Sequence, residues 1–323
     1  MSFIHRVFGV LLNRIGMLDY TQEDNLVNRE GAISYLPSSP ERGLFNPRIP
    51  GRNNRPPMSL RIIPSMLKLM IPMKSNMKKT LSSLEKNPAS PRRSIEDAEL
   101  HELSEYAFSL GIGAIGFCKL EPKYIFQKKA VLYDNVIVLS QEMNFDRIET
   151  APSPLCQKEV IETYNTLGIK TNQIVDYLRN KGFAVQAGHP LGGLTLYPPL
   201  AWLAGMGWHG VNGIVIGPEY GPRHRLSAIY TSISNLPIFE VNEHQWVEEF
   251  CKSCQLCVKE CPGEAIFGEP KTLEDGRKKY VDDDKCFPVF VGHHGCSVCI
   301  KVCPFNRSGY DKLKMSYEKK NLL

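Results

Sequence analysis

From residue 94 onward, hydrophobic and polar positions follow two different periods along the chain. Apolar positions that recur every three to four residues predict helices, whereas continuous or every-second apolar positions predict strands. Helices are predicted over 94–111, 160–182 and 198–207, strands over 113–120, 131–143 and 183–188, and a strand–turn–strand unit over 213–234. Helices and strands alternate, which predicts an α/β or α+β core over residues 94–240, and we take α+β as the fold class.

The ends of two predicted helices carry recognisable signals. Ser94 followed by Asp97 predicts a capped helix start, and Gly111 predicts its end. Gly182 predicts the end of the second helix, after a basic last turn.

Residues 1–93 are predicted to form an irregular, basic arm. Proline and asparagine recur over 36–57, where they block helix interiors and strand ladders. Further on, methionines stand at near-helical spacing, at Met66, Met70, Met73 and Met77. We interpret this stretch as a partly ordered arm over the main domain, in which methionine fills irregular gaps. A strip that binds a membrane surface or a partner is the alternative.

Composition and charge exclude several classes of protein. The chain has 323 residues and a formal net charge of +5, and it carries no recognised DNA- or RNA-binding motif. No run of 18 apolar residues is present, so no membrane span is predicted. Residues 3–15 predict a short amphipathic helix, not a secretory signal, because Arg6 and Arg14 interrupt the apolar positions. No twin-arginine pair stands near the start, so a cytoplasmic location is expected.

The cysteines are strongly clustered. Eight of the ten lie between residues 251 and 303, while Cys118 and Cys156 stand apart and are expected to be buried small hydrophobes. Disulfide frameworks belong to small secreted domains, so clustered cysteines in a large chain without a secretory signal indicate metal ligands.

The spacing of the eight cysteines predicts two [4Fe–4S] clusters in a ferredoxin-like unit over 241–310, followed by a tail over 311–323. Each run has the form C-x2-C-x3-C-P, and a further cysteine precedes it, separated from it by two residues in the first run and nine in the second. In bacterial ferredoxin runs, three close thiolates bind one cluster and the fourth cysteine of the run ligates the other cluster. The predicted ligands of cluster 1 are therefore Cys251, Cys254, Cys257 and Cys303, and those of cluster 2 are Cys286, Cys296, Cys299 and Cys261.

Zinc is the competing metal, since two C-x2-C pairs can hold one zinc ion. Zinc ribbons need two pairs per site and not two longer runs that each end in proline, so iron–sulfur is favoured. His293 and His294 lie near cluster 2, and we interpret them as loop residues because every ligand position is filled.

Several segments resemble the corrinoid-dependent reductive dehalogenases and the related epoxyqueuosine reductases. Similar segments include 142–153 (EMNFDRIETAPS), the helix with Tyr164 that continues into 176–183, and 204–226 (AGMGWHGVNGIVIGPEYGPRHRL). The nine-residue gap after Cys286 is closer to the dehalogenases. The resemblance covers roughly 94–306 and implies a nitroreductase-like core that binds cobalamin base-off, with electrons delivered by the clusters.

The resemblance also implies which residues approach the cobalamin. Glycines in the similar segment fit a backbone brought close to a large planar cofactor, although plain turns are the alternative interpretation. The implied cofactor-binding residues are Tyr197, Gly205, Gly207, Gly210, Gly213, Tyr220, Arg223 and Arg225.

By motif position, Tyr164 matches the proton-donating tyrosine of the dehalogenases. Such a phenol needs a nearby cation. The families usually carry Arg or Lys at the place of Val211, and this chain departs from that pattern. His209, Arg223 and Arg225 are the candidates for the missing basic partner.

The epoxyqueuosine reductases use a catalytic aspartate in the segment that corresponds to 186–202, where this chain has no Asp or Glu. His189 is the candidate acid in this segment, because imidazole titrates near neutral pH, although a structural role is the alternative. The two departures leave the substrate unidentified.

Three functions follow as hypotheses. The favoured one is a cytoplasmic corrinoid-dependent reductase that acts on a small organic electrophile and receives electrons from a low-potential donor such as ferredoxin or flavodoxin. The second is epoxyqueuosine reduction in tRNA, which the missing aspartate disfavours. The third is a two-cluster electron carrier without corrinoid.

Overall fold

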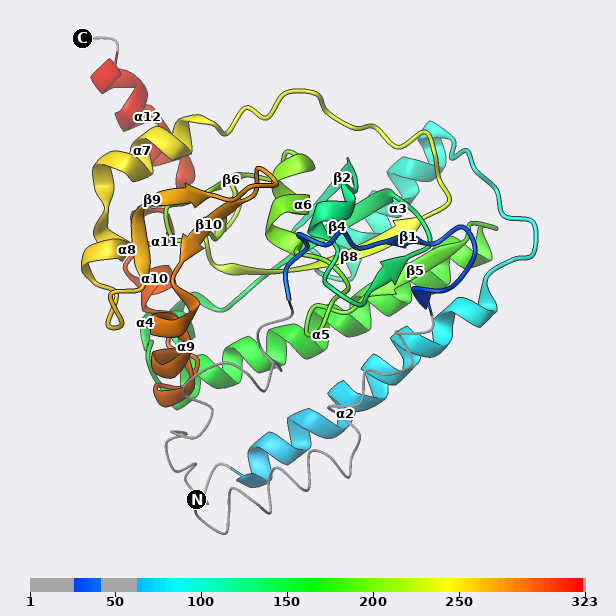
Figure 1. The fold of residues 1–323 in the computed structure, drawn as a ribbon, viewed down its shortest axis with the longest axis horizontal. Helices are drawn as coiled ribbons and strands as arrows, with labels where there is room; N and C mark the ends of the chain where they lie inside the picture. The colour runs from blue at the N-terminus through cyan, green and yellow to red at the C-terminus, as the bar shows by residue number, and fades with distance from the viewer. Residues whose placement is uncertain (1–25, 42–62, 322–323) are drawn as a thin grey trace.

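A computed structural model of the chain describes residues 26–41 and 63–321. A mixed α/β core occupies one side of the molecule, and the cysteine-rich unit packs against the opposite side (Figure 1). The amphipathic helix predicted for 3–15 lies outside the described residues. Among the described helices, none combines the length and hydrophobicity needed to cross a lipid bilayer.

The centre of the core is a four-stranded sheet in which all neighbours are antiparallel. Its strands are β2 (Ala114–Lys119), β4 (Asn135–Glu142), β8 (His224–Thr231) and β5 (Val185–Gly188), in the order β2-β4-β8-β5. Four of the predicted strand segments therefore form one sheet. The first strand of the 213–234 unit is the short β7 (Val215–Ile216), which pairs with β6 (Trp208–His209).

The central strand β4 explains why both faces of the sheet are covered. Successive side chains of a strand point to opposite faces, and the first six residues of β4 are all buried. Ile137 and Leu139 belong to the apolar cluster under α3 (Asp97–Ser109) and α5 (Pro154–Asn180). Val136 and Val138 join the cluster under α6 (Tyr197–Leu203). A continuous apolar run thus forms a strand between two helical layers.

The helix predicted over 94–111 is α3, but the predicted cap was wrong. The N-cap is Glu96, and a capping box joins it to Glu99 at the third helical position; Arg92 holds the Glu99 carboxylate at 2.8 Å. Ser94 therefore lies outside the helix. The next helix, α5, begins six residues before the predicted start, because Ser153 accepts the Cys156 N–H and Pro154 occupies the first turn, where its missing N–H costs nothing.

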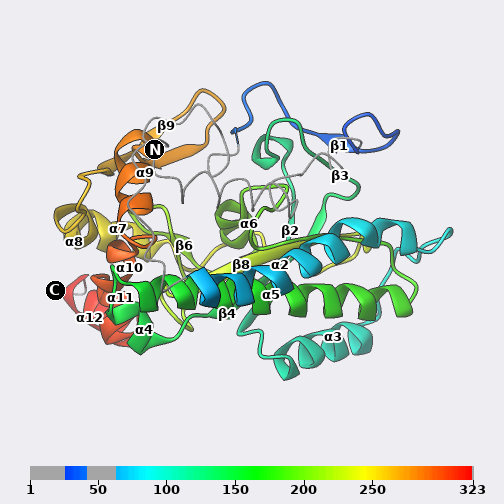
Figure 2. The same ribbon diagram turned by 90° about the horizontal axis from the view of Figure 1, so that it is seen from below.

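The arm is less irregular than predicted. Residues 63–82 form α2 (Ile63–Ser82), which lies along α5 (Figures 1 and 2). Met73 and Met77 are buried, in agreement with their near-helical spacing. Buried polar contacts tie the two helices together, since the Thr80 hydroxyl donates to the Asn172 side chain at 3.1 Å. Shorter elements complete this side: β1 (Ile33–Ser34) with β3 (Ala130–Val131), η3 (Ser83–Lys86) and η4 (Pro122–Tyr124).

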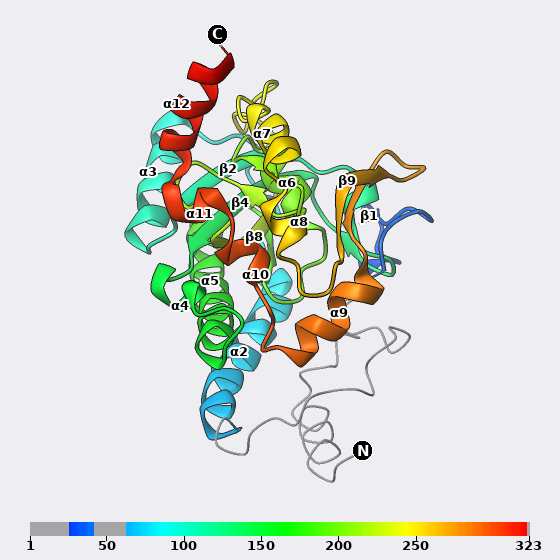
Figure 3. The ribbon, with the colours of Figure 1, turned by 90° about the vertical axis from the view of Figure 1, so that its left-hand side faces the viewer.

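The cysteine-rich unit consists of short helices around one hairpin. Its helices are α7 (Trp246–Cys254), α8 (Leu256–Lys259), α9 (Asp283–Gly292), α10 (Val298–Lys301), α11 (Pro304–Ser308) and α12 (Tyr310–Asn321), with α4 (Phe145–Glu149) of the core beside α10. The hairpin is β9 (Ile266–Thr272) and β10 (Lys278–Val281), inserted between the two cysteine runs. Figure 3 shows this unit from the side that faces away from the sheet.

Gly168 in α5 provides a test of how tightly α2 and α5 are packed. A Cβ at this position would lie 2.4 Å from both the Asn76 Nδ2 and the His189 Nε2 atoms. In an open helix, Gly→Ala stabilises by about 1 kcal/mol. Here we expect Gly168→Ala to destabilise the fold by roughly 1–3 kcal/mol, because overpacking outweighs helix propensity.

The measurement is the thermal unfolding midpoint by circular dichroism, which should fall by several degrees. Gly292→Ala in α9, where an added Cβ meets nothing within 4 Å, is the matched control and should leave the midpoint unchanged or slightly raised. A stabilising Gly168→Ala would contradict the tight packing of α2 on α5.

Candidate metal centre and its surroundings

The eight clustered cysteines fall into two groups in space. A small cavity is lined by Cys251, Cys254, Cys257 and Cys303, from α7, α8 and the start of α11. Phe250 and Phe305 also line this cavity. The first group therefore combines three cysteines of the first run with the last cysteine of the second, as the spacing predicts.

The second group contains the remaining four thiols. Cys286 lies close enough to Cys261 and Cys296 for their charges to raise its pKa, although burial is the larger cause. The pKa of Cys299 is likewise raised, mainly by burial and in addition by the charges of Cys257, Cys296, Cys286 and Cys261. The Cys257 contact shows that the two groups adjoin each other.

Burial dominates the acid–base properties of these thiols. It raises the pKa of Cys251 and Cys299 to about 12, and that of Cys257 and Cys286 to about 11. Metal ligation requires thiolates, so binding of a metal would release protons from these groups.

Backbone amides point at several of the sulfurs. The Ala265 N–H donates to the Cys261 sulfur at 3.4 Å, and the Val211 amide favours the Cys251 thiolate. Left-handed residues directly after Cys254 and Cys296, namely Gln255 at φ 52° and Ser297 at φ 65°, turn the chain between neighbouring thiols. Thiolates that accept amide hydrogen bonds suit an iron–sulfur cluster, whose potential depends on such bonds. The donor set therefore fits two clusters.

Tyr164 and Arg225 meet on the side of the core that faces the second group. The Arg225 guanidinium carbon lies 5.0 Å from the centre of the Tyr164 ring. Arg225 also influences the pKa of Cys156, which burial raises, and Cys296 of the second group acts on the same thiol. Of the three predicted basic partners, Arg225 is thus the one that contacts Tyr164.

The elements that carry this pair also carry polar atoms without hydrogen-bond partners. Among the residues that the structure describes, five buried side-chain polar atoms lack a hydrogen bond, and three of them are Gln141 Oε1, Asn165 Oδ1 and Arg225 Nε. Gln141 is the cross-strand neighbour of Arg225, and Asn165 follows Tyr164 in α5. Because buried polar groups are normally paired, these atoms are available to a bound molecule.

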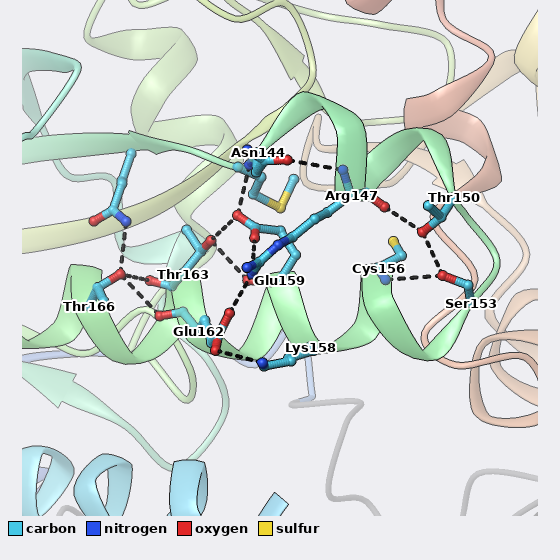
Figure 4. A network of polar contacts seen from close by, with 12 residues as sticks. Asn144, Arg147, Thr150, Ser153, Cys156, Lys158, Glu159, Glu162, Thr163 and Thr166 are labelled. Carbon is cyan, nitrogen blue, oxygen red and sulfur yellow. Dashed lines mark hydrogen bonds and ion pairs between the residues drawn. The ribbon is translucent and has the colours of Figure 1, made fainter. Parts of the chain in front are cut away.

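A network of charged and hydroxyl groups, which the sequence did not indicate, fixes the start of α5 (Figure 4). Arg147 of α4 contacts Glu159 at 3.0 Å and Glu162 at 2.6 Å. The buried Glu159 also accepts the Asn144 N–H at 2.7 Å. Because these contacts hold the helical turns that precede Tyr164, they fix its position relative to β8.

Arg223 joins the core to the cysteine-rich unit, whereas Tyr220 packs within the core. Arg223 donates to the Asn306 side chain at 2.9 Å, to the Met143 carbonyl at 2.7 Å and to Glu142. A Cβ on Gly113 would meet the Tyr220 hydroxyl, so this ring packs against the start of β2. These contacts are with the protein itself, and the implied contact of both side chains with a cofactor stays a prediction.

His189 and Tyr197 lie in a third region, under α2. The His189 Nε2 contacts the Asn76 amide at 3.2 Å, and the Tyr197 hydroxyl donates to the His189 carbonyl at 2.9 Å. Both side chains are buried in the core. The structure therefore does not bring the predicted acid His189 together with Tyr164 through any recorded contact, and its contacts match the structural alternative.

His209 lies on the first thiol group's side, in a cavity of about 370 Å³ that Cys251 and Val211 also line. Its ring stacks on Tyr280, with ring centres 5.3 Å apart. Burial lowers the pKa of His209 to about 4, so the imidazole is neutral at pH 7.

The four predicted glycines shape the turns around β6. A Cβ on Gly207 would lie 2.3 Å from the Ile216 carbonyl oxygen, and one on Gly213 would lie 2.8 Å from the Tyr280 Cβ. Gly205 has a φ of +67°, and Gly210 bonds to Ile214 and Gly213 through its backbone. Close packing against the protein itself accounts for Gly207 and Gly213, and a positive φ accounts for Gly205. The implied contact of these glycines with a cofactor stays a prediction.

Comparison with known proteins agrees with this geometry. A model described as 4Fe-4S dicluster domain matches residues 250–307. Tetrachloroethene reductive dehalogenase of Desulfitobacterium hafniense is 32% identical over 216 residues, which cover 61% of this chain and 37% of that protein. Epoxyqueuosine reductase of Listeria monocytogenes is 35% identical over 115 residues, or 33% of this chain and 28% of that protein.

Solved structures show the same fold. The catabolic reductive dehalogenase NpRdhA, in complex with 3-bromo-4-hydroxybenzoic acid, matches 77% of this chain and 38% of its own, with a TM-score of 0.63 and 18% identity. A reductive dehalogenase structure described as suggesting a mechanism for B12-dependent dehalogenation covers 77% of this chain and 39% of its own, with a TM-score of 0.62 and 18% identity. The chain spans a little over a third of the length of its first relatives.

The thiol groups and the matched domain define an iron–sulfur protein of the 4Fe–4S dicluster class. Within that class, the chain is similar both to reductive dehalogenases and to epoxyqueuosine reductases.

The crossed assignment of ligands can be tested with paired variants. If Cys254 and Cys303 serve one cluster, Cys254→Ala/Cys303→Ala should lose that cluster and keep about four irons per chain. Cys254→Ala/Cys261→Ala, which removes two ligands of the first run, should disturb both clusters and keep close to none.

The measurement is iron analysis after anaerobic reconstitution, with circular dichroism to verify the fold. Each cluster would take its ligands from a single run if the Cys254/Cys261 variant kept four irons and the Cys254/Cys303 variant kept none.

Proposed function

We propose that the protein is a corrinoid-dependent reductase, similar to the reductive dehalogenases. In this proposal, two [4Fe–4S] clusters pass electrons to a cobalamin bound beside Tyr164, which reduces a small organic electrophile. The observation that carries the proposal is the Arg225 guanidinium over the Tyr164 ring, next to the second thiol group. The names of the relatives add dehalogenation as the reaction.

The residues around Tyr164 fit a corrinoid. The rim of a corrin carries amide side chains, which both donate and accept hydrogen bonds. Two acceptors, Gln141 Oε1 and Asn165 Oδ1, and one donor, Arg225 Nε, have no partner in the protein. We propose accordingly that the core is nitroreductase-like and holds the cofactor base-off. When bound, cobalamin would supply a low-potential, nucleophilic cobalt centre.

Tyr164 and Arg225 have complementary roles in this proposal. Replacement of a halogen by hydrogen consumes two electrons and one proton and releases halide. The clusters supply the electrons and the Tyr164 hydroxyl donates the proton. The positive charge of Arg225 stabilises the phenolate that remains, and Tyr164 recovers its proton from solvent.

The chain keeps Tyr164 in place from two sides. The network around Arg147 and Glu159 fixes the helix on which the tyrosine stands. From the sheet, Arg225 is held in register by the pairing of β8 with β4. The donor of electrons in this proposal is a reduced ferredoxin or flavodoxin, and the reaction takes place in the cytoplasm.

Anaerobic reconstitution with cobalamin tests the cofactor. We expect about eight irons and one cobalt per chain, with an absorbance band of base-off corrin. Cobalt uptake should fall in Gln141→Leu, which removes an unpartnered acceptor, and should persist in Ser34→Ala, where the unpartnered hydroxyl lies far along the chain on β1. Eight irons without cobalt would overturn the corrinoid proposal and favour an electron carrier.

Tyr164→Phe tests the proton donor. With clusters and cobalamin retained, we expect kcat for dehalogenation of 3-bromo-4-hydroxybenzoic acid or tetrachloroethene to fall by about 10²–10⁴-fold, the range for loss of a general acid. Tyr177→Phe is the matched control, because it stands on the same helix about 20 Å away and should keep full activity.

Halide release measures the reaction. Unchanged activity in Tyr164→Phe would refute the assigned role. Turnover of epoxyqueuosine tRNA without halide release would place the chain with the second group of relatives.

A further inference from the structure

The cavity beside Cys251 is separate from the Tyr164 site. One wall comes from α6 and β6, with Trp202, Trp208 and His209. An adjoining wall comes from the β9–β10 hairpin, with Tyr280. None of the residues around Tyr164 lines it. A volume of about 370 Å³ is at the small end of ligand pockets, which run from about 300 to 1,000 Å³.

The cavity is rich in aromatic rings whose polar atoms are unused. Trp202 packs edge-on against Trp208, with ring centres 5.6 Å apart, and His209 stacks on Tyr280. In the part of the chain that the structure describes, none of these four side chains forms a recorded hydrogen bond through its ring nitrogen or hydroxyl. Buried Tyr and Trp normally find partners, so up to four donors are available to a ligand that carries acceptors.

The charged side chains at the rim of the cavity do not act as partners for these ring donors, because most of them form ion pairs with each other. Lys252 is paired with Glu248 at 3.3 Å, Lys123 with Glu121 at 2.7 Å and Arg277 with Asp275 at 2.7 Å. Lys278 bonds to the Thr272 hydroxyl and has no carboxylate partner in the described structure. A flat ring with partly negative oxygens therefore matches both the walls and the rim.

The hairpin encloses the cavity and is fastened to the arm. The Arg277 guanidinium donates to the Ser38 carbonyl at 2.6 Å, which joins the hairpin to the residues that follow β1. Asp275 orients Arg277. The wall is thus built by contacts between segments distant in the sequence and is not an open surface.

The cavity lies beside a predicted cluster ligand, a position suited to electron exchange. Cys251 of the first thiol group lines it, while the Tyr164–Arg225 pair adjoins the second group. The two sites therefore lie at opposite ends of the two-cluster path, so a molecule in the cavity would contact a ligand of cluster 1.

We propose that this cavity binds a small planar conjugated molecule with carbonyl oxygens, of the quinone or flavin type, which exchanges electrons with cluster 1. One electron passes between the ring and the cluster, so that one is oxidised as the other is reduced, and no covalent bond changes. The proposal deepens the proposed function by adding a site for the electron carrier. It requires the clusters but not the corrinoid.

Binding to the anaerobically reconstituted full chain tests the proposal. Menadione, a bicyclic quinone, should quench tryptophan fluorescence with saturation. 2-Methylnaphthalene has the same rings without oxygens and should bind at least about tenfold more weakly, because the loss of one or two hydrogen bonds costs that much. Equal affinities, or no saturable binding, would overturn the proposal.

Riboflavin tests the larger member of the same class. The cavity volume favours two fused rings, so menadione should bind more tightly. Tighter riboflavin binding would assign the carrier to the flavin type within the same proposal.

Variants locate the site. Tyr280→Phe removes one donor and should weaken menadione binding roughly 2- to 12-fold, with no change for 2-methylnaphthalene. Trp246→Phe is the matched control, because the Trp246 indole already donates to the Tyr310 hydroxyl at 2.8 Å outside the cavity. If Trp246→Phe weakened binding as much as Tyr280→Phe, the cavity would not be the site.

Two further measurements separate this proposal from the proposed function. After reduction of the clusters, menadione should reoxidise them and restore their visible absorbance faster in the unmodified chain than in Tyr280→Phe, at equal iron content. Menadione binding should persist after cobalamin is loaded. If cobalamin abolishes it, the cavity belongs to the corrinoid site and the separate site is refuted, while cobalt uptake itself stands. Failure of cobalt uptake with menadione binding intact would refute only the corrinoid.

Discussion

The close packing of the segment 207–223 between the sheet and the thiols is the constraint on which the rest of the structure depends. A Cβ on Gly221 would lie 2.9 Å from the Phe305 backbone, two residues after the last cysteine. Arg223 bonds to Asn306 on one side and to the Met143 carbonyl on the other. Closer to the first group, the Val211 amide favours the Cys251 thiolate. Because these contacts are short and involve backbone atoms, the core and the cysteine-rich unit form one rigid arrangement.

That arrangement gives the two thiol groups different surroundings. The first group is enclosed by Phe250 and Phe305 and opens toward an aromatic cavity. The second group lies beside Cys156, and the positive charge of Arg225 acts to lower the pKa of that thiol. Cluster potentials depend on burial, hydrogen bonds and nearby charge. Positive charge favours the reduced cluster, so the charge of Arg225 would draw electrons toward the second group and thus toward Tyr164.

The elements with long apolar runs were predictable, whereas their ends were less so. β4 and α5 were expected because burial on both faces and a 3.6-residue period leave strong signals. The cap of α3 was mistaken because Glu96, two residues after Ser94, forms a capping box with Glu99, whose carboxylate Arg92 also holds. The grouping of the thiols could be predicted since cluster geometry imposes its spacing on the chain. The aromatic cavity could not, because Trp208 and Tyr280 lie far apart in sequence and meet only through the hairpin.

The glycine-rich segment shows how one pattern can serve two purposes. Its glycines suggested a cofactor loop, and in the structure they let the backbone pack against Ile216 and Tyr280. Valine at position 211, where the related families usually carry Arg or Lys, then suits its surroundings. Val211 is buried and lines both the first thiol group and the aromatic cavity, where an unpaired cation would be costly to bury. An apolar residue at this position leaves the aromatic cavity lined by rings. The cation that contacts Tyr164 is instead Arg225, on β8.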